Sequence, residues 1–154
     1  MAKRRDLIRM SEEEIWTFVE EQKSLQVATI GRDGAPHLTT LWFAVVDGRI
    51  VFETFTKSQK VLNLKRDPRI VVLLEDGEAY DRLRGVSIQG HAELHDRPEE
   101  VHPYAMAVMR RNQPEIPEDQ VSEAARALAA KRTAVVVNPD RFVSWDHNKL
   151  GGSY

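Results

Sequence analysis

Residues 47–75 read DGRIVFETFTKSQKVLNLKRDPRIVVLLE, and this stretch decides the fold. It opens on Asp47-Gly48, a strong signal for a tight β-hairpin turn, and a return strand is expected over 49–53. Residues 58–67 carry a short apolar set at helical spacing before a proline, which predicts a short helix. A further strand is expected over 70–75. The middle of the chain is therefore predicted to be two strands joined through a short helix.

The N-terminal side of this stretch predicts a helix followed by strands. A capping box, Ser-Glu-Glu-Glu, opens residues 11–22, which are expected to form the helix. Residues 25–30 have the composition of a strand, and the glycines and proline of 31–36 signal a turn. A longer β-rich run follows over 37–46. Together with the return strand, these runs predict an antiparallel meander of three strands.

The C-terminal side adds strands and a helical insert. Alternating apolar and polar residues over 86–94 predict a half-buried strand. Residues 97–131 have a helical pattern interrupted by two prolines. A last strand is expected over 134–138, with residues 141–145 as its extension past Pro139. The chain, 1–154, is thus predicted to be a single mainly β (α+β) domain. It would be a small barrel of six antiparallel strands, with an N-terminal helix and a helical pair before the last strand.

Composition narrows the class of protein. The chain has no cysteine, which removes disulfides, thiolate metal sites and cysteine nucleophiles. Its net charge of −2 argues against a general nucleic-acid binder, and its apolar runs are too short to span a bilayer. No apolar segment follows the basic N-terminus, so no secretory signal is expected. These features favour a cytoplasmic protein. The five histidines lack the spacing of a metal site, so no metal is expected.

The segment between the return strand and the short helix, TFTKSQK over 54–60, is a candidate anion site. Ser58 is placed to cap the helix, whose first backbone N–H groups then point outward and attract anions. Lys57 and Lys60 add two positive charges there, and two threonines add hydroxyl groups. The alternative is that both lysines are solvated and that Ser58 is only a cap. Spacing alone supports the two interpretations equally.

Two other segments have an unusual pattern. The strand around Trp42 carries bulky or hydroxyl-bearing side chains on both faces, which fits burial on both sides or a ligand on one. The simpler alternative makes Trp42 a core residue. The C-terminal segment 145–154 carries two aromatic residues, a histidine and two glycines, which favours folding back onto this molecule or a partner. The alternative is a partly disordered tail with Trp145 packed on the barrel.

Taken in order, these segments resemble the pyridoxamine 5'-phosphate oxidase-like split β-barrel superfamily. The resemblance rests on the N-terminal helix, VATIGRDGAPHLTTLWF (27–43), the stretch 47–75 and VSIQGHAEL (86–94), and it resumes from residue 133. The C-terminal WDHNKLGGSY is similar to the branch that uses the deazaflavin coenzyme F420 in place of FMN. The fold implied is a six-stranded antiparallel split β-barrel.

The resemblance implies a homodimer with the cofactor in a groove between the two barrels. The phosphate end would be held by Lys57, Ser58 and Lys60. The C-terminal segment would reach the cofactor groove of the partner subunit through Trp145 and Lys149. The ring system would lie against two strands. Its contacts would be Thr39, Thr40, Leu41 and Trp42 on the first strand and Thr54, Phe55 and Thr56 on the second.

The function implied by the resemblance is transfer of a hydride from reduced coenzyme F420 to an unsaturated or quinone-like small molecule. The protein would supply binding, orientation and exclusion of water. No catalytic residue is identified, although His147 or a water could donate a proton. Two alternatives stay open: an FMN-dependent oxidoreductase on the same fold, and a barrel that binds a cofactor or tetrapyrrole without turnover. The helical insert could cover the substrate opening.

Overall fold

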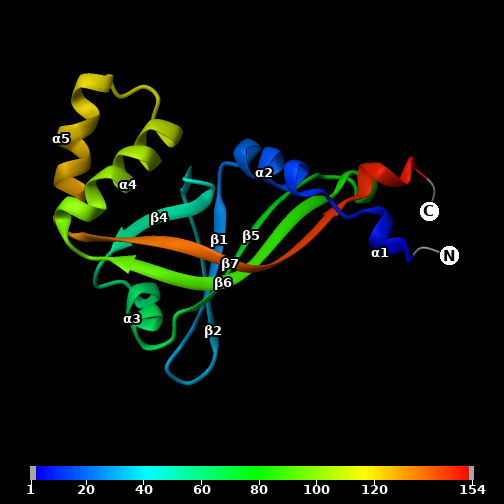
Figure 1. Cartoon of the computed structure of the whole chain (residues 1–154), viewed down its shortest axis with the longest axis horizontal. Coiled ribbons are helices and arrows are strands. Elements are labelled where there is room, and N and C mark those ends of the chain that lie inside the picture. Colours follow the sequence, from blue (N-terminus) through cyan, green and yellow to red (C-terminus); the bar gives the residue numbers. More distant parts are fainter. Residues whose placement is uncertain (1–2, 153–154) are drawn as a thin grey trace.

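A curled antiparallel sheet with helices at both of its ends makes up the computed structural model, which describes residues 3–152 (Figure 1). Ser153 and Tyr154, the end of the expected C-terminal segment, lie outside the described residues. The helices are α1 (Arg4–Leu7), α2 (Glu12–Glu21), α3 (Gln59–Arg66), α4 (Pro98–Asn112) and α5 (Glu118–Ala129), with short 3-10 turns η1 (Tyr80–Arg82) and η2 (His147–Leu150). The strands are β1 (Leu25–Ile30), β2 (Pro36–Leu41), β3 (Ala44–Val46), β4 (Arg49–Phe55), β5 (Arg69–Asp76), β6 (Arg84–His95) and β7 (Arg132–Asp146).

The chain connection between β2 and β3 closes the sheet. The strand order is β2-β1-β5-β6-β7-β4-β3, so β2 and β3 are the two edges. Only Trp42 and Phe43 separate these edges in the chain. The three peptide units from Leu41 to Ala44 span at most about 11 Å. The two edges therefore lie close together, and the sheet has to curl into a barrel.

This topology confirms the predicted antiparallel barrel and corrects two details. The sheet has seven strands where six were expected, because the run 37–46 breaks after Leu41 into β2 and β3. At the break Trp42 stays 43% exposed, whereas Phe43 turns completely inward, so the run cannot continue as one ladder. The expected three-strand meander is interrupted there, and β2 pairs only with β1.

The predicted helices are all present, while the short α1 was not predicted, and the last strand continues past Pro139 as residues 141–145 indicated. Ser11 caps α2 with both hydrogen bonds of the capping box, and α4 and α5 form the predicted helical pair. β7 runs through 134–138 and the expected extension over 141–145, and it pairs with β6 as far as Asp146. A bulge opposite Gly90 carries it past Pro139. A Cβ at Gly90 would lie 2.2 Å from the Asn138 carbonyl oxygen, so this crossing requires glycine.

The barrel interior is filled by alternating residues of the strands and by one helix. Fully buried Val27, Phe52, Val72 and Val135 come from four different strands. Phe18 of α2 packs against the same core and is 2% exposed. α2 therefore covers one side of the barrel with its apolar face, as its amphipathic sequence predicts.

The helical insert packs on the outer face of the barrel. Val108 of α4 is buried against Ala44, Val51 and Val136, which form one row across β3, β4 and β7. Figure 1 shows α4 and α5 beyond β4, at the opposite end of the molecule from both termini. The insert therefore covers an apolar strip that β3, β4 and β7 would otherwise expose to water.

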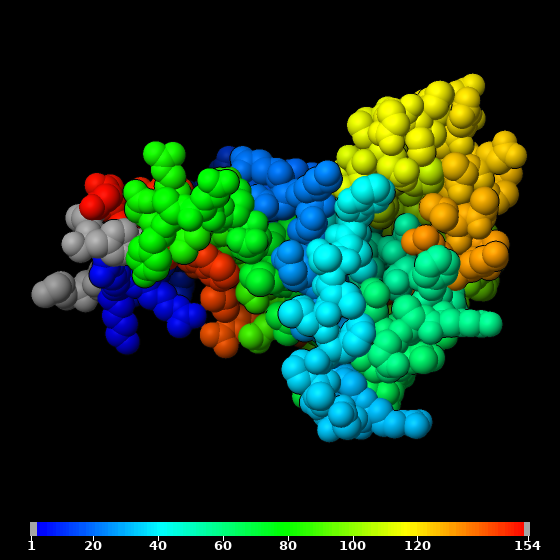
Figure 2. Space-filling view, turned by 180° about the vertical axis from the view of Figure 1, so that it is seen from behind, coloured from blue at the N-terminus to red at the C-terminus, as the bar shows by residue number. Residues whose placement is uncertain are grey.

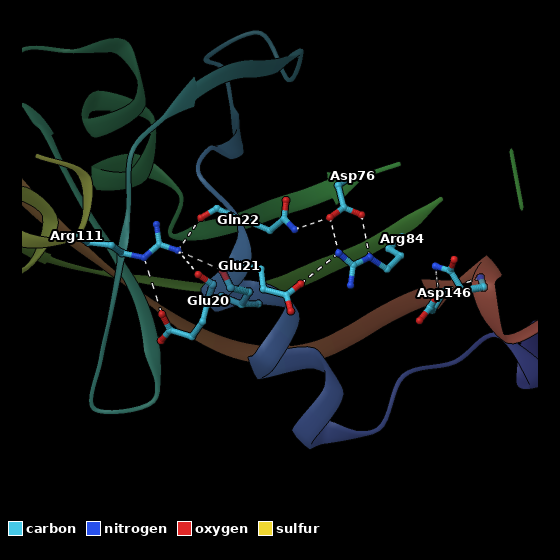
Figure 3. Close-up of polar contacts among 9 residues, drawn as sticks. Glu20, Glu21, Gln22, Asp76, Arg84, Arg111 and Asp146 are labelled. Atoms are coloured by element: carbon cyan, nitrogen blue, oxygen red, sulfur yellow. Dashed lines mark hydrogen bonds and ion pairs between the residues drawn. The ribbon is translucent and has the colours of Figure 1, made fainter. Parts of the chain in front are cut away.

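Arg111 of α4 ties this insert to α2 (Figure 3). Its guanidinium donates to the backbone carbonyls of Val19, Glu20 and Gln22 at 3.4, 3.0 and 2.6 Å, and it lies 4.1 Å above the Phe43 ring. These carbonyls belong to the end of α2, where the Val19 carbonyl also accepts from the Gln22 backbone N–H at 3.2 Å and the carbonyls of Glu20 and Gln22 lie beyond the helical ladder. One side chain thus joins α4, the end of α2 and the β2–β3 crossover.

Arg84 of β6 holds the same end of α2 from the other side (Figure 3). It donates to the two carboxylate oxygens of Asp76 at 2.9 and 2.6 Å and reaches Glu21 at 3.2 Å. The Gln22 amide also donates to Asp76, at 2.9 Å. The hydrogen bonds from Arg84 keep the pKa of Asp76 below its usual value. The end of α2 is therefore fixed between two arginines.

Replacing Arg111 by methionine should lower the free energy of unfolding by about 2–3 kcal/mol, because partly buried carbonyls lose their donor. Denaturant titration followed by tryptophan fluorescence measures this at fixed protein concentration. Arg110→Met is the matched control, since Arg110 is exposed and pairs only with Glu118. Its effect should stay within about 0.5 kcal/mol. Equal effects of the two substitutions would contradict the assigned role of Arg111.

Candidate functional site

The N-terminus of α3 has the geometry of an anion cradle. The Ser58 hydroxyl oxygen accepts a hydrogen bond from the Val61 backbone N–H at 3.4 Å, which confirms Ser58 as the N-cap. The N–H groups of Gln59 and Lys60 open the helix and have no acceptor within it. The Ser58 hydroxyl proton is not used by this cap, so it can be donated to a ligand. Three donors therefore converge at one helix end.

Two lysines beside this helix end have no counter-ion. Lys60 is half-buried, Lys57 is exposed, and neither has a hydrogen bond or ion pair within residues 3–152. The other cations of α3 are engaged, since Lys65 pairs with Asp96 at 3.2 Å and Arg66 donates to the Ile30 carbonyl. Burial lowers the pKa of Lys60 from its ordinary 10.5. An anion bound here would restore the charge stabilisation that burial removes.

The helix is fixed to the barrel by a buried asparagine. Asn63 is completely buried, and its amide donates to the Thr29 hydroxyl oxygen of β1 at 3.0 Å. Its own oxygen accepts from the Gln59 amide at 2.8 Å and from Arg66 at 3.4 Å. The polar groups of this side chain thereby set where the first turn of α3 lies. The position of the cradle thus depends on a contact with a different element of the fold.

The residues that lead into the cradle point to opposite faces of β4. Thr54 is 6% exposed and faces the barrel interior, whereas Phe55 is 56% exposed on the outer face, 4.5 Å from the Arg132 guanidinium. The hydroxyl of Thr56 is 3.0 Å from that of Thr133, which donates to Asp96. Asp96 can only accept while ionised, so Thr133 must accept from Thr56. Thr56 therefore holds the loop and has no hydroxyl proton left for a ligand.

The expected residues of β2 are also divided between two faces. Thr39 and Leu41 are half-buried toward the interior, and Thr40 and Trp42 are exposed. The Thr39 hydroxyl oxygen is buried and has no hydrogen-bond partner. β2 and β4 are not hydrogen-bonded neighbours, because the barrel closes between them through the crossover. A planar ring system can contact either the inner or the outer face of these strands, and only the outer face is exposed to solvent.

A hollow of about 430 Å³ lies between the β1–β2 hairpin and α3. His37, Gln59 and Asn63 line it together with Gly31, Arg32, Asp33, Ala35 and Pro36. The Nδ1 atom of His37 is buried and has no hydrogen-bond partner. The same is true of the Thr39 hydroxyl oxygen, which lies on the same face of β2. Figures 1 and 2 show this hairpin beside α3. The hollow therefore adjoins the cradle.

The C-terminal segment lies at the other end of the molecule from the cradle (Figure 1). The Trp145 ring fills the space over Gly85, where a Cβ would approach it to 2.1 Å. Lys149 donates to Glu14 at 2.7 Å and to the Arg9 carbonyl at 2.8 Å. His147 Nδ1 donates to the Tyr80 carbonyl at 2.6 Å. One chain does not bring Trp145 and Lys149 to its own cradle, so their contact with a partner's cofactor stays a prediction.

Three residues near the cradle were not singled out from the sequence. His37 is on β2, two residues before the predicted contact Thr39. Arg132 is the first residue of β7, and Asp96 lies at the junction of β6 and α4. Asp96 is ionised readily, because the Thr133 hydroxyl and Lys65 lower its pKa. The sequence contains no spacing signal for any of them, since each reaches the site through strand pairing or a turn.

Neither a membrane span nor a metal cluster is present in the described part of the chain. Within residues 3–152 no helix is long and apolar enough to cross a bilayer. The same residues contain no group of three or more histidine, aspartate or glutamate side chains able to hold a metal ion.

The curled antiparallel sheet described above is a split β-barrel. The chain belongs to the pyridoxamine 5'-phosphate oxidase family, whose model matches residues 11–146. No curated protein matches the sequence.

Solved structures share this fold. A conserved hypothetical protein, Rv2991, of Mycobacterium tuberculosis is 45% identical, with a TM-score of 0.91 over 99% of this chain and 95% of its own. An F420 reductase is 24% identical, with a TM-score of 0.65 over 82% of this chain and 93% of its own. The haem storage protein HutZ of Vibrio cholerae is 15% identical, with a TM-score of 0.63 over 86% and 94%. The last two likenesses concern the fold alone.

Asn63→Leu should lower the free energy of unfolding by about 2–3 kcal/mol, because it leaves the Thr29 hydroxyl buried without a partner. Adding Thr29→Val should recover part of this loss, since both polar groups are then replaced by apolar ones. Denaturant titration of the two single variants and the double variant measures the coupling. Strictly additive effects would show that the two side chains do not interact.

Proposed function

We propose that this protein is an F420-dependent oxidoreductase that reduces an unsaturated or quinone-like small molecule. The observation that carries the proposal is the pair of unpartnered lysines at the N-terminus of α3. Lys60 is half-buried without a counter-ion, and it lies beside free backbone N–H groups. Such a site suits a phosphate group, which the deazaflavin and FMN both carry.

The cofactor would be held by the unused hydrogen-bond donors at the start of α3 and by the exposed side chains around β2 and β4. Lys57, Lys60, the Ser58 hydroxyl and the first N–H groups of α3 would bind the phosphate end. On the outer face, Thr40, Trp42 and Phe55 are exposed and would contact the ring system. Thr39, Leu41 and Thr54 point inward and would support those contacts from behind. Thr56 would hold the loop in place through Thr133.

The hydride chemistry is that of the reduced deazaflavin, and the protein contributes binding, orientation and exclusion of water. The side chains at the cradle fit this division of labour, because they offer charge and donors and include no paired nucleophile and base. The assignment of F420 over FMN rests on the C-terminal sequence pattern. Binding of a haem-like ligand without turnover is the alternative from a different functional class.

A second copy of the chain would complete the site. Leu38, Ala28 and Val71 are in register across β2, β1 and β5, and they form one apolar row on the outer face of the sheet. Leu38 is 68% exposed and Val71 is 37% exposed. Covering this row would remove apolar surface from water, which favours association. We therefore propose a homodimer through this face, with the partner's C-terminal segment near the cradle.

Replacing Lys57 and Lys60 together by alanine should weaken cofactor binding at least about a hundredfold, because two charge-assisted contacts are lost. Fluorescence titration with F420 and with FMN measures it. Lys23→Ala, an exposed lysine between α2 and β1, is the matched control and should bind normally. Binding to the wild type should also weaken as the pH rises, and this should begin before pH 10.5, because the lowered pKa of Lys60 makes it lose its charge earlier than an ordinary lysine. Unchanged affinity in the double variant would refute the cradle.

The choice between cofactors is tested with the same protein. F420 should bind more tightly than FMN or haem, and the F420 complex should reduce some member of a panel of quinones and enones. Tight binding of FMN alone would replace the proposed cofactor. Binding of haem with no turnover of any reduced cofactor would instead support the non-catalytic alternative.

Leu38→Arg should convert the homodimer to a monomer, because it replaces the most exposed side chain of the apolar row by a charge. Sedimentation velocity of the wild type and variant measures the change. Arg126→Glu on α5 changes an exposed charge away from this face and should leave the dimer intact. A monomeric wild type, or a Leu38→Arg variant that stays dimeric, would contradict the proposed interface.

A further inference from the structure

The basic N-terminal sequence forms one wall of a second hollow, which is distinct from the cradle. This hollow has a volume of about 350 Å³ and lies between the N-terminal segment and the far half of β7. Its lining combines Arg5, Arg9 and Arg141 with Met10, Ile15, Phe142, Val143 and Ser144. Figures 1 and 2 both show α1 and this end of β7 at the opposite end of the molecule from α3.

The wall of the hollow is held by contacts between the two ends of the chain. The backbone N–H of Asp146 donates to the Ile8 carbonyl at 2.7 Å, and that of Met10 donates to the Ser144 hydroxyl at 3.0 Å. Lys149 fixes the intervening residue by donating to the Arg9 carbonyl at 2.8 Å. The backbone that carries Arg9 is therefore built into the fold by long-range hydrogen bonds.

The charges around the hollow are of one sign. None of its lining residues is acidic. Arg5 and Arg141 have no hydrogen bond or ion pair within residues 3–152, and Arg9 only approaches exposed Asp6 at 3.9 Å. The neighbouring carboxylates are occupied, since Asp140 binds His91 and Glu14 binds Lys149. The guanidinium groups that line one hollow repel one another, the distant Asp6 offsets this only at Arg9, and a bound anion would relieve the repulsion.

The floor of the hollow is apolar. Met10 and Ile15 are buried there, and the Phe142 ring is 37% exposed and meets Trp16 edge to face at 6.1 Å. A free inorganic anion would leave the exposed part of the Phe142 ring in contact with water. A ligand with both a multiply charged head and an apolar body would use the arginines and the floor together.

We propose that Arg5, Arg9 and Arg141 form a binding site for an organic phosphate monoester with an apolar body. The guanidinium groups bind the phosphate, because their donors match its oxygens in pairs, and the Phe142 side of the hollow takes the apolar body. The site does not depend on the proposed cofactor or on its cradle. It also gives the basic N-terminal sequence and the Lys149 contact a role.

The test is isothermal titration of the full chain with 1-naphthyl phosphate, in the Lys57→Ala, Lys60→Ala background so that the cradle does not contribute. We expect saturable binding of one ligand per chain that weakens with added salt. Inorganic phosphate and 1-naphthol, which supply the head and the body separately, should each bind at least about tenfold more weakly. Equal binding of 1-naphthol, or no saturable binding, would overturn the proposal.

Matched variants assign the binding to the hollow. Arg5→Gln and Arg141→Gln should each weaken 1-naphthyl phosphate binding by about tenfold or more, and the pair should abolish it. Both side chains are exposed, so the variants should fold as the wild type does. Arg126→Gln, an exposed arginine on α5, should leave the affinity unchanged. Affinity unaffected by Arg5→Gln and Arg141→Gln together would place the ligand elsewhere and refute the site.

Discussion

The crossover of Trp42 and Phe43 is the constraint on which the rest of the structure depends. It joins the two edge strands of one sheet, and two residues are too few to do so unless the sheet curls. Phe43 is then buried, with Arg111 above its ring and Asn112 donating to its carbonyl at 2.9 Å. Barrel closure and docking of the helical insert are consequences of the same two residues.

The position of the candidate anion cradle depends on this barrel. α3 leaves β4 at the outer wall and is fixed to β1 by Asn63, so its free N–H groups and the unpaired Lys57 and Lys60 lie at one place. The charges alone would not make a site, because solvated lysines are ordinary. Partial burial of Lys60 without a counter-ion is what favours a bound anion over water.

Much of this could be predicted along the chain, because local signals act over a few residues. The capping box at Ser11 and the N-cap at Ser58 both formed as expected. The sequence predicted six strands and missed the break at Trp42. The pattern of side chains there could not show that Phe43 turns inward while Trp42 stays exposed. That Thr39 and Thr54, two of the expected ring contacts, face the interior of the barrel also required the structure. Asp96 and Arg132 reach the site only through strand register.

The sequence by itself determined most of the elements and indicated the family, because caps, turns and alternation are local properties of the chain, and it singled out the residues that we propose bind an anion. The tertiary structure decided which of those residues have free donors. It assigns Thr56 to Thr133 and Lys149 to Glu14, while Lys57 and Lys60 keep no partner in the described part of the chain. It also brought Arg5 and Arg9 beside Arg141. Only folding sets such distances, since these residues are more than a hundred positions apart in the sequence.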